Sequence, residues 1–318
     1  MNDDYLWDRS GDADPEVVRL EELLGRFRHS VARPPRRQAR TWLIAAAAIV
    51  TLAVGCGLAL RFYNRQPGSA LTSWQVSIEG REPVSLRTGQ IVETSSSQAT
   101  MTSPQVGQVR LSPDSRLQLL KASQGEQRFA LNHGTVHALI WAPPKQFIVD
   151  TPSAKVVDLG CQYTLRVDKD GSGALTVETG WVAFEWQHLE SFIPAEATCR
   201  TRRNQGPGTP YFLDASPELT AALTRFDAHP DAPALTSILS AARKRDALTL
   251  WHLLERTEGP DRARVWDRFS SLTAPPARLS RDAILRGDRA ALDEAWNLLG
   301  LGDMNWWRGW ERPWPRHN

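Results

Sequence analysis

The feature that most constrains this chain is a long stretch without any charged side chain. Thr41 to Leu60 reads TWLIAAAAIVTLAVGCGLAL, which is twenty residues. An α-helix rises about 1.5 Å per residue, so roughly this length crosses a hydrocarbon core about 30 Å thick. A secretory signal peptide would start near residue 1, whereas forty mostly polar residues precede this stretch. The sequence therefore predicts one transmembrane helix over residues 41–62.

Arginines are distributed unevenly on the two sides of the predicted span. Six of them lie in residues 26–40, whereas only Arg61 and Arg65 lie just beyond the other end. Basic residues stay preferentially on the cytoplasmic side of a membrane. We therefore expect a bacterial inner-membrane protein with a cytoplasmic N-terminus and with its C-terminal bulk in the periplasm. The net charge of only +2 argues against direct nucleic-acid binding.

The inner segment, residues 1–40, contains one predicted helix with an apolar face. The helix is expected to begin at Pro15, because Asp14 can cap its free N–H groups and proline suits the first helical position. Apolar side chains then follow Val17 at helical spacing, namely Leu20, Leu23, Leu24 and Phe27. A segment this small cannot bury such a face by itself. Its acidic first 25 residues disfavour an anionic lipid surface, so a cytoplasmic protein partner is expected rather than contact with lipid.

Residues 63–204 are predicted to form an all-β domain. Short runs rich in Val, Ile, Thr and aromatic residues alternate with glycine and proline turns. Many short strands at close spacing are typical of a sandwich, a barrel or a short β-solenoid. Asp168–Gly173 joins two of these runs and contains Asp-Gly, which favours a hairpin turn.

A linker and then a helical, tryptophan-rich region are predicted to follow the strands. Residues 205–216 contain Gln-Gly-Pro-Gly-Thr-Pro and are interpreted as the linker, and residues 217–318 show apolar residues at helical spacing. Trp251-His252-Leu253-Leu254 recurs as Trp296-Asn297-Leu298-Leu299, 45 residues later. This offset suits a helical solenoid repeat, but a plain helical bundle explains two copies equally well.

No motif for catalysis or for cofactor binding is present. The nucleophile elbow, the zinc-protease helix, the phosphate-binding loop and the dinucleotide fingerprint are all absent from the sequence. We therefore expect no enzyme, no cofactor and no metal site. Two cysteines, Cys161 and Cys199, lie on the predicted periplasmic side, where oxidation is permitted. A disulfide between them is predicted, and the alternative is a pair of buried thiols.

Four segments of the predicted β-domain resemble the motifs of the FecR-domain family. They occur in the family's order across roughly residues 85–190. The segments are Leu131–Ala138 (LNHGTVHA), Phe147–Ala154 (FIVDTPSA), Val157–Tyr163 (VDLGCQY) and Val177–Val182 (VETGWV).

The resemblance implies a membrane-anchored regulator of an extracytoplasmic-function sigma factor. In such proteins a cytoplasmic N-terminal segment either holds the sigma factor, as an anti-sigma factor does, or activates it. The outer domain senses a signal relayed from the outer membrane, which implies a periplasmic or outer-membrane signalling partner. The inner segment here is shorter than usual and lacks a zinc-binding His/Cys set, and the family's receptor-contacting C-terminal portion is replaced by helices. Iron transport is therefore not supported as the signal, and an envelope scaffold without signalling is the rival hypothesis.

Overall fold

The computed structural model describes residues 15–25, 73–78, 82–187 and 189–302. The chain divides into two compact units, Met1–Gln66 and Pro67–Asn318. The described part of the first unit is helix α2 (Pro15–Gly25), which begins at the residue that the sequence predicts. Within the described ranges, no helix is long and apolar enough to cross a membrane, and the predicted span over residues 41–62 lies outside those ranges.

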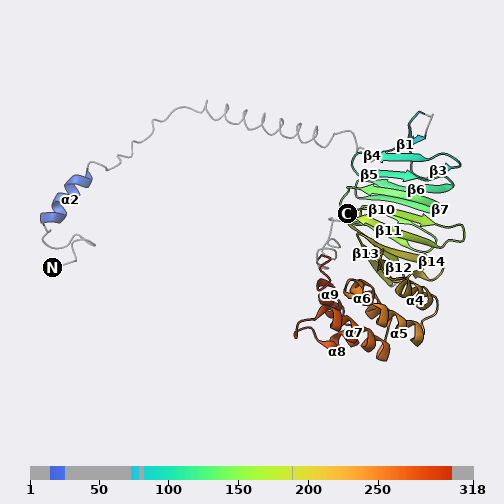
Figure 1. The fold of residues 1–318 in the computed structure, drawn as a ribbon. Coiled ribbons are helices and arrows are strands. Elements are labelled where there is room, and N and C mark those ends of the chain that lie inside the picture. Colours follow the sequence, from blue (N-terminus) through green and yellow to red (C-terminus); the bar gives the residue numbers. More distant parts are fainter. Residues whose placement is uncertain (1–14, 26–72, 79–81, 188, 303–318) are drawn as a thin grey trace. The chain divides into compact units, whose positions relative to one another are not determined.

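The second unit begins with a series of short β-strands (Figure 1). They are β1 (Trp74–Ile78), β2 (Val84–Leu86), β3 (Ile91–Thr94), β4 (Ala99–Ser103), β5 (Gly107–Leu111), β6 (Ser115–Ser123), β7 (Glu126–Ile140), β8 (Phe147–Asp150), β9 (Lys155–Asp158), β10 (Gln162–Val167), β11 (Gly173–Thr179), β12 (Trp181–Trp186), β13 (Leu189–Pro194), β14 (Ala197–Arg202), β15 (Gly206–Pro207) and β16 (Tyr211–Phe212). The prediction of a mostly β domain followed by helices is confirmed.

Strand β7 connects the two sheets of the β-domain. Its first half pairs with β6 and, in parallel, with β8, whereas its second half pairs with β5 and β10. The change of partners occurs at Gly134, whose φ of 105° favours glycine. A Cβ atom at this position would lie only 2.4 Å from the Cα atom of Ser115. Only glycine therefore lets the strand pass from one sheet to the other here.

The aromatic centre of the β-domain core joins side chains from both sheets. The ring of Trp74 on β1 lies 5.2 Å from that of Phe129 on β7 and 6.0 Å from that of Phe147 on β8, measured between centroids. All three side chains are buried. The indole N–H of Trp74 donates to Oε1 of Gln127 at 3.0 Å, so the buried polar atom is paired. Large aromatic area removed from water therefore holds the two sheets together.

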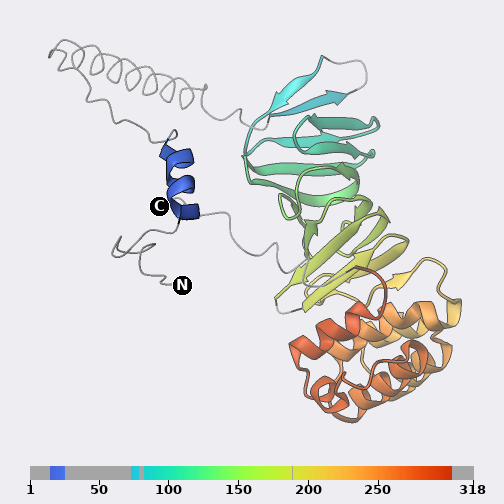
Figure 2. The same ribbon diagram turned by 90° about the vertical axis from the view of Figure 1, so that its left-hand side faces the viewer.

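The helices lie at one end of the stack of strands, next to the last strands in the sequence (Figure 2). They are α4 (Pro217–Ala228), α5 (Ala232–Ala241), the short 3-10 helix η1 (Lys244–Asp246), α6 (Ala247–Arg256), α7 (Gly259–Thr273), α8 (Arg281–Leu285) and α9 (Arg289–Asn297). Side chains of Ser216, Asp231 and Asp288 each accept a hydrogen bond from a first-turn N–H group of α4, α5 and α9. These caps explain why the helices begin where they do. The helices α4 to α9 are called the helical layer below.

The helical layer is attached to the β-domain by a cluster of aromatic rings. Trp251 on α6 and Trp296 on α9 are fully buried, and their ring centroids lie 4.8 Å apart. Phe192 on β13 lies 6.3 Å from Trp251 and 5.7 Å from Trp296. The sequence recurrence therefore reflects two helices that each contribute an indole to the same contact with the sheet.

The structure differs from the predicted linker over residues 205–216. Strands β15 and β16 within this segment both pair with β14, and Phe212 is buried. In the sequence, a run of glycine and proline indicates a linker without regular secondary structure. Here Gly206 has a φ of 81°, and a Cβ atom at this position would lie 2.5 Å from the Trp186 ring. Gly206 therefore allows the chain to pack closely against Trp186, and the segment belongs to the β-domain.

Candidate functional site

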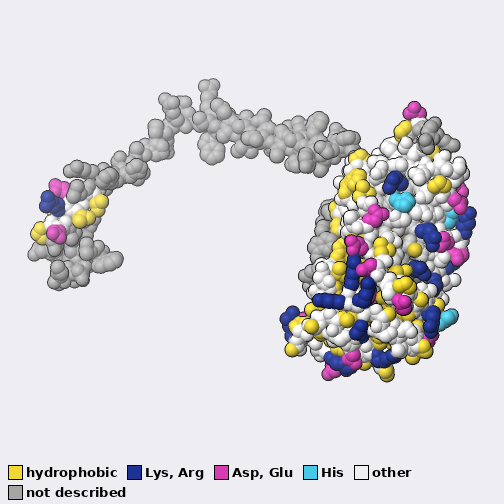
Figure 3. Space-filling view, in the orientation of Figure 1, with side chains coloured by type: hydrophobic (Ala, Val, Ile, Leu, Met, Phe, Trp, Pro, Cys, Tyr) yellow, Lys and Arg dark blue, Asp and Glu magenta, His cyan; other side chains and the backbone are white. Residues whose placement is uncertain are grey.

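The predicted binding face on α2 consists of Leu20, Leu23, Leu24 and Phe27. Leu20 is 59% exposed and Leu24 is 57% exposed. They lie four residues apart, and so they share one face of the helix. The side chain of Leu23 and all of Phe27 lie outside the described residues. Figure 3 shows hydrophobic side chains at the surface of α2 among charged ones. Its two described leucines thus offer apolar surface to water or to a partner.

The predicted disulfide between Cys161 and Cys199 is wrong, because both residues are free, buried thiols. Cys161 immediately precedes β10, which meets β11 at Thr179, whereas Cys199 on β14 meets β11 at Leu175. Four residues of a strand span about 13 Å, so the two Cα atoms lie far beyond the roughly 7 Å that a disulfide can bridge. Burial raises the pKa of the Cys199 thiol to about 12.

One of the FecR-like motifs holds a buried carboxyl group. Asp158 is 1% exposed at the end of β9, and burial raises the pKa of its side chain to about 7. Its Oδ1 atom accepts a hydrogen bond from the N–H group of Gly160 at 2.7 Å, and the thiol of Cys161 donates to Oδ2. The cysteine is therefore a partner of this carboxyl group.

A buried histidine connects the helical layer to the sheet. His252 on α6 is fully buried, and its Nδ1 atom lies 2.9 Å from the carbonyl oxygen of Leu248. Its Nε2 atom accepts a hydrogen bond from the N–H group of Phe192 at 3.0 Å. An acceptor on one side and a donor on the other fix the neutral ring with its proton on Nδ1. Burial lowers the pKa of this ring to about 3.

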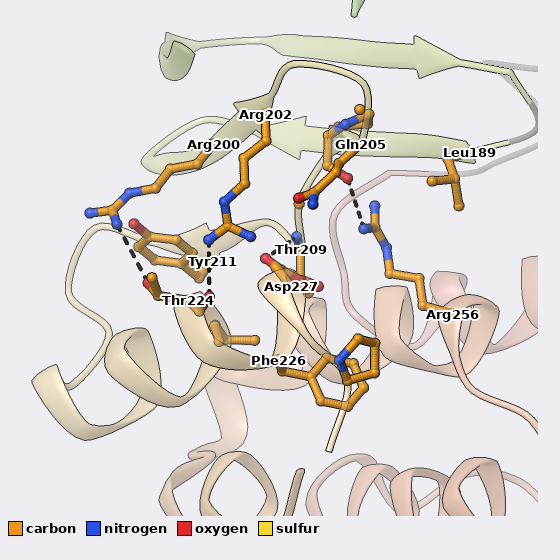
Figure 4. Close-up of a pocket in the computed structure, with 15 residues that line it drawn as sticks. Leu189, Arg200, Arg202, Gln205, Thr209, Tyr211, Thr224, Phe226, Asp227 and Arg256 are labelled. Atoms are coloured by element: carbon orange, nitrogen blue, oxygen red, sulfur yellow. Dashed lines mark hydrogen bonds between the residues drawn. The ribbon is translucent and has the colours of Figure 1, made fainter. Parts of the chain in front are cut away.

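A pocket of about 220 Å³ opens between the last strands and the helical layer (Figure 4). Three arginines line it, and they define what is called the arginine pocket below. Arg200 and Arg202 come from β14, and Arg256 comes from the end of α6. Figure 4 shows the first two reaching toward Thr224 on α4, while Arg256 approaches from the opposite side.

The three guanidinium groups bind only neutral acceptors of the described chain. Arg202 donates to the carbonyl oxygen of Thr224 at 3.0 Å, and Arg200 donates to the hydroxyl of the same residue at 3.4 Å. Arg256 donates to the carbonyl oxygen of Pro207 at 2.9 Å and to the hydroxyl of Ser191 at 2.5 Å. Among the described residues, no carboxylate forms an ion pair with any of the three arginines.

Among the described residues that line the pocket is one carboxylate, that of Asp227, which is hydrogen-bonded to the pocket wall. Both oxygens of Asp227 accept hydrogen bonds from Thr209, one from the backbone N–H at 2.8 Å and one from the hydroxyl at 2.7 Å. A Cβ atom at position 208 would lie 2.5 Å from Oδ2 of Asp227, so a larger residue there would displace this carboxylate. The segment that was predicted to be a linker is therefore a wall of the pocket.

The sequence predicts no binding role for any of the pocket residues, and it indicates a linker for those that lie in residues 205–216. A usable signal is the run Arg200-Thr201-Arg202, because alternate residues of a strand lie on the same face. Nothing in the sequence pairs Arg256 with that run, since the contact depends on how the helical layer packs. In the part of the chain that the structure describes, no group of three His, Cys, Asp or Glu residues could hold a metal ion.

A family model and solved structures match part of this chain. Two crystal structures, each described as a "putative anti-sigma factor" from Parabacteroides distasonis ATCC 8503, match with 17% identity and a TM-score of 0.35. Each match covers 42% of this chain and 64% of the length of the crystallised chain. No curated protein matches the chain. The model of the FecR protein family matches residues 84–183, which include all four motif segments, and these residues are therefore a FecR domain.

Proposed function

We propose that this chain is a single-pass inner-membrane signal transducer that regulates an extracytoplasmic-function sigma factor. In this proposal the FecR domain senses a signal in the periplasm, and α2 binds the sigma factor in the cytoplasm. The chain acts by binding and has no catalytic role. The observation that carries the proposal is the apolar face of α2, joined in one chain to a FecR domain.

The exposed leucines of α2 supply a binding energy that a simple anchor would not need. Leu20 and Leu24 stand on one face and are more than half exposed. Burying one leucine side chain on a partner is worth roughly 1.5–3 kcal/mol before the cost of ordering the helix. A helix laid in a groove of another protein uses such anchors at three- and four-residue steps. A sigma factor is the partner class that the FecR domain favours.

The membrane topology in this proposal is supported by the uncharged stretch and by the arginines before it. Alkaline phosphatase is active only outside the cytoplasm, so its fusion after Asn318 should be active and its fusion after Ser30 inactive. The reverse pattern would put α2 and the sigma factor in different compartments and would contradict the proposal.

Crosslinking tests the partner of α2 directly. A photoreactive amino acid placed at Leu24 in the full-length chain should crosslink in cells to a sigma factor, identified by mass spectrometry. The same probe at Val18 is the matched control. Val18 is also exposed, but it lies on the other side of the helix, because residues follow each other at about 100°. A scaffold without signalling would give no sigma-factor crosslink at either position.

A further inference from the structure

We propose that the arginine pocket binds a small oxyanion, namely the phosphate or carboxylate group of a small molecule. The site is formed by Arg200, Arg202 and Arg256, between β14 and the helical layer. It lies outside residues 84–183, which the FecR family model matches. The proposal does not depend on the binding of a sigma factor to α2.

The first argument is the excess of positive charge around the pocket. Three arginines line the cavity, and among the described lining residues the only carboxylate is that of Asp227, which is hydrogen-bonded to Thr209 through both oxygens. Arg202 and Arg256 are partly buried, so water screens their mutual repulsion incompletely. An anion bound in the cavity would offset the excess of positive charge, whereas a neutral ligand would not.

The second argument is the number of unused donors. Each guanidinium group has five N–H donors in a planar fork. The described residues accept four hydrogen bonds from the three groups together. Most of the donors therefore remain for a ligand or for water. Forked N–H donors match the paired oxygens of carboxylates and phosphates, which is why arginine is preferred over lysine at such sites.

The third argument is that the cavity is built and small. Gly206, with a φ of 81°, lies close against the Trp186 ring and Gly208 lies close against the Asp227 carboxylate, and the two glycines form one wall of the cavity. The volume of about 220 Å³ is below the roughly 300–1,000 Å³ of pockets for drug-sized ligands. The buried side chains of Leu223 and Phe226 line the same cavity, so a short apolar body next to the anionic group would be accommodated.

Calorimetric titration of the full-length protein in detergent tests the site. Inorganic phosphate and succinate are the two probes, because they separate phosphate from carboxylate recognition, and sodium chloride keeps the ionic strength constant. We expect saturable binding of at least one probe. Arg202→Gln should weaken that binding roughly tenfold or more, because it removes charge-assisted hydrogen bonds.

Arg203→Gln is the matched control, because Arg203 follows directly in sequence, is exposed and does not line the pocket. It should leave the affinity within about twofold of wild type, because Arg203 does not line the pocket and so cannot donate a hydrogen bond to an anion bound there. Arg200→Gln serves as a second pocket variant, because Arg200 is exposed and forms one long hydrogen bond, so its loss should leave folding intact. The proposal would be overturned if neither probe bound saturably to wild type. It would also be overturned if Arg203→Gln weakened binding as much as the two pocket variants do.

Discussion

The FecR domain and the helical layer each bury a side chain whose displaced pKa affects stability in acid, and the two respond to pH in opposite ways. Asp158 in the FecR domain has a pKa raised to about 7, so it keeps its proton in the folded state after the unfolded chain has lost it. The contribution of this group to the free energy of unfolding is largest below about pH 4 and is lost as the pH rises to 7. The carboxyl group therefore favours the folded state in acid.

His252 in the helical layer has a pKa lowered to about 3, so it stays neutral while the unfolded chain binds a proton below about pH 6.5. The contribution of this group to the free energy of unfolding is largest above about pH 6.5 and is lost as the pH falls to 3. Between about pH 4 and 6.5 the two effects nearly cancel. The free energy of unfolding of the whole protein can therefore stay constant over this pH range although each of the two groups, taken alone, makes it change strongly.

The aromatic contact between the two regions should give the largest effect. Trp296→Ala removes a fully buried indole that packs on Trp251 and Phe192, and it should lower the free energy of unfolding by about 3–5 kcal/mol. Trp141→Ala is the control, because that side chain is 51% exposed. Urea titration of the full-length chain measures both. Equal losses would mean that the helical layer does not depend on this cluster.

The pH dependence of each region can be uncovered by removing the other region's buried group. In Asp158→Asn only the histidine remains, so the free energy of unfolding should rise with pH by about 1.4 kcal/mol per unit between pH 4 and 6.5. Asparagine keeps an oxygen for the N–H group of Gly160. Urea titrations across this pH range measure the slope. If the free energy of unfolding of this variant does not change with pH, His252 does not have the role that we give it.

His252→Gln should give the opposite slope. Only Asp158 then remains, so the free energy of unfolding should fall by about 1.4 kcal/mol per pH unit over the same range. The variant is expected to be less stable than wild type at pH 7, because the hydrogen bond from Phe192 is weakened. The slope therefore carries the test rather than the absolute stability. A variant that gains stability with rising pH would contradict the role of Asp158.

The smallest expected effect concerns the two cysteines. Because Cys161 and Cys199 are free, a reductant should leave the melting temperature of the folded protein unchanged. Iodoacetamide should label both in urea without prior reduction, and peptide mass spectrometry reports each site. Labelling that requires a reductant would restore the disulfide and contradict the register of β10, β11 and β14.

The sequence predicts local structure well where one residue type determines it. Helix α2 begins at Pro15, as predicted, and the first helix of the predicted helical region begins at Pro217. Asp168–Gly173 forms the predicted turn between β10 and β11, with Gly171 at a φ of 86°. These features depend on neighbouring residues, and so they can be read from the chain directly.

Features that depend on distant packing could not be predicted in this way. The disulfide prediction failed because the register of three strands separates two cysteines that share a compartment. The glycines at 206 and 208 predict a linker, but in the structure they lie in close contact with Trp186 and Asp227. The arginine pocket went unpredicted for the same reason, since Arg256 meets β14 only after the helical layer has packed. The binding face of α2 stays a prediction.

The central claim, that α2 controls a sigma factor, is tested most directly by transcription in cells. Leu20→Asp and Leu24→Asp together should change the transcript levels of a sigma-dependent set of genes, measured by RNA sequencing, because two carboxylates cannot be buried on the partner. Val18→Asp makes the same chemical change on the opposite side of the helix and should leave those transcripts at the wild-type level. All chains must be present in the membrane fraction in equal amounts. If the double variant and wild type have the same transcripts, α2 does not regulate a sigma factor.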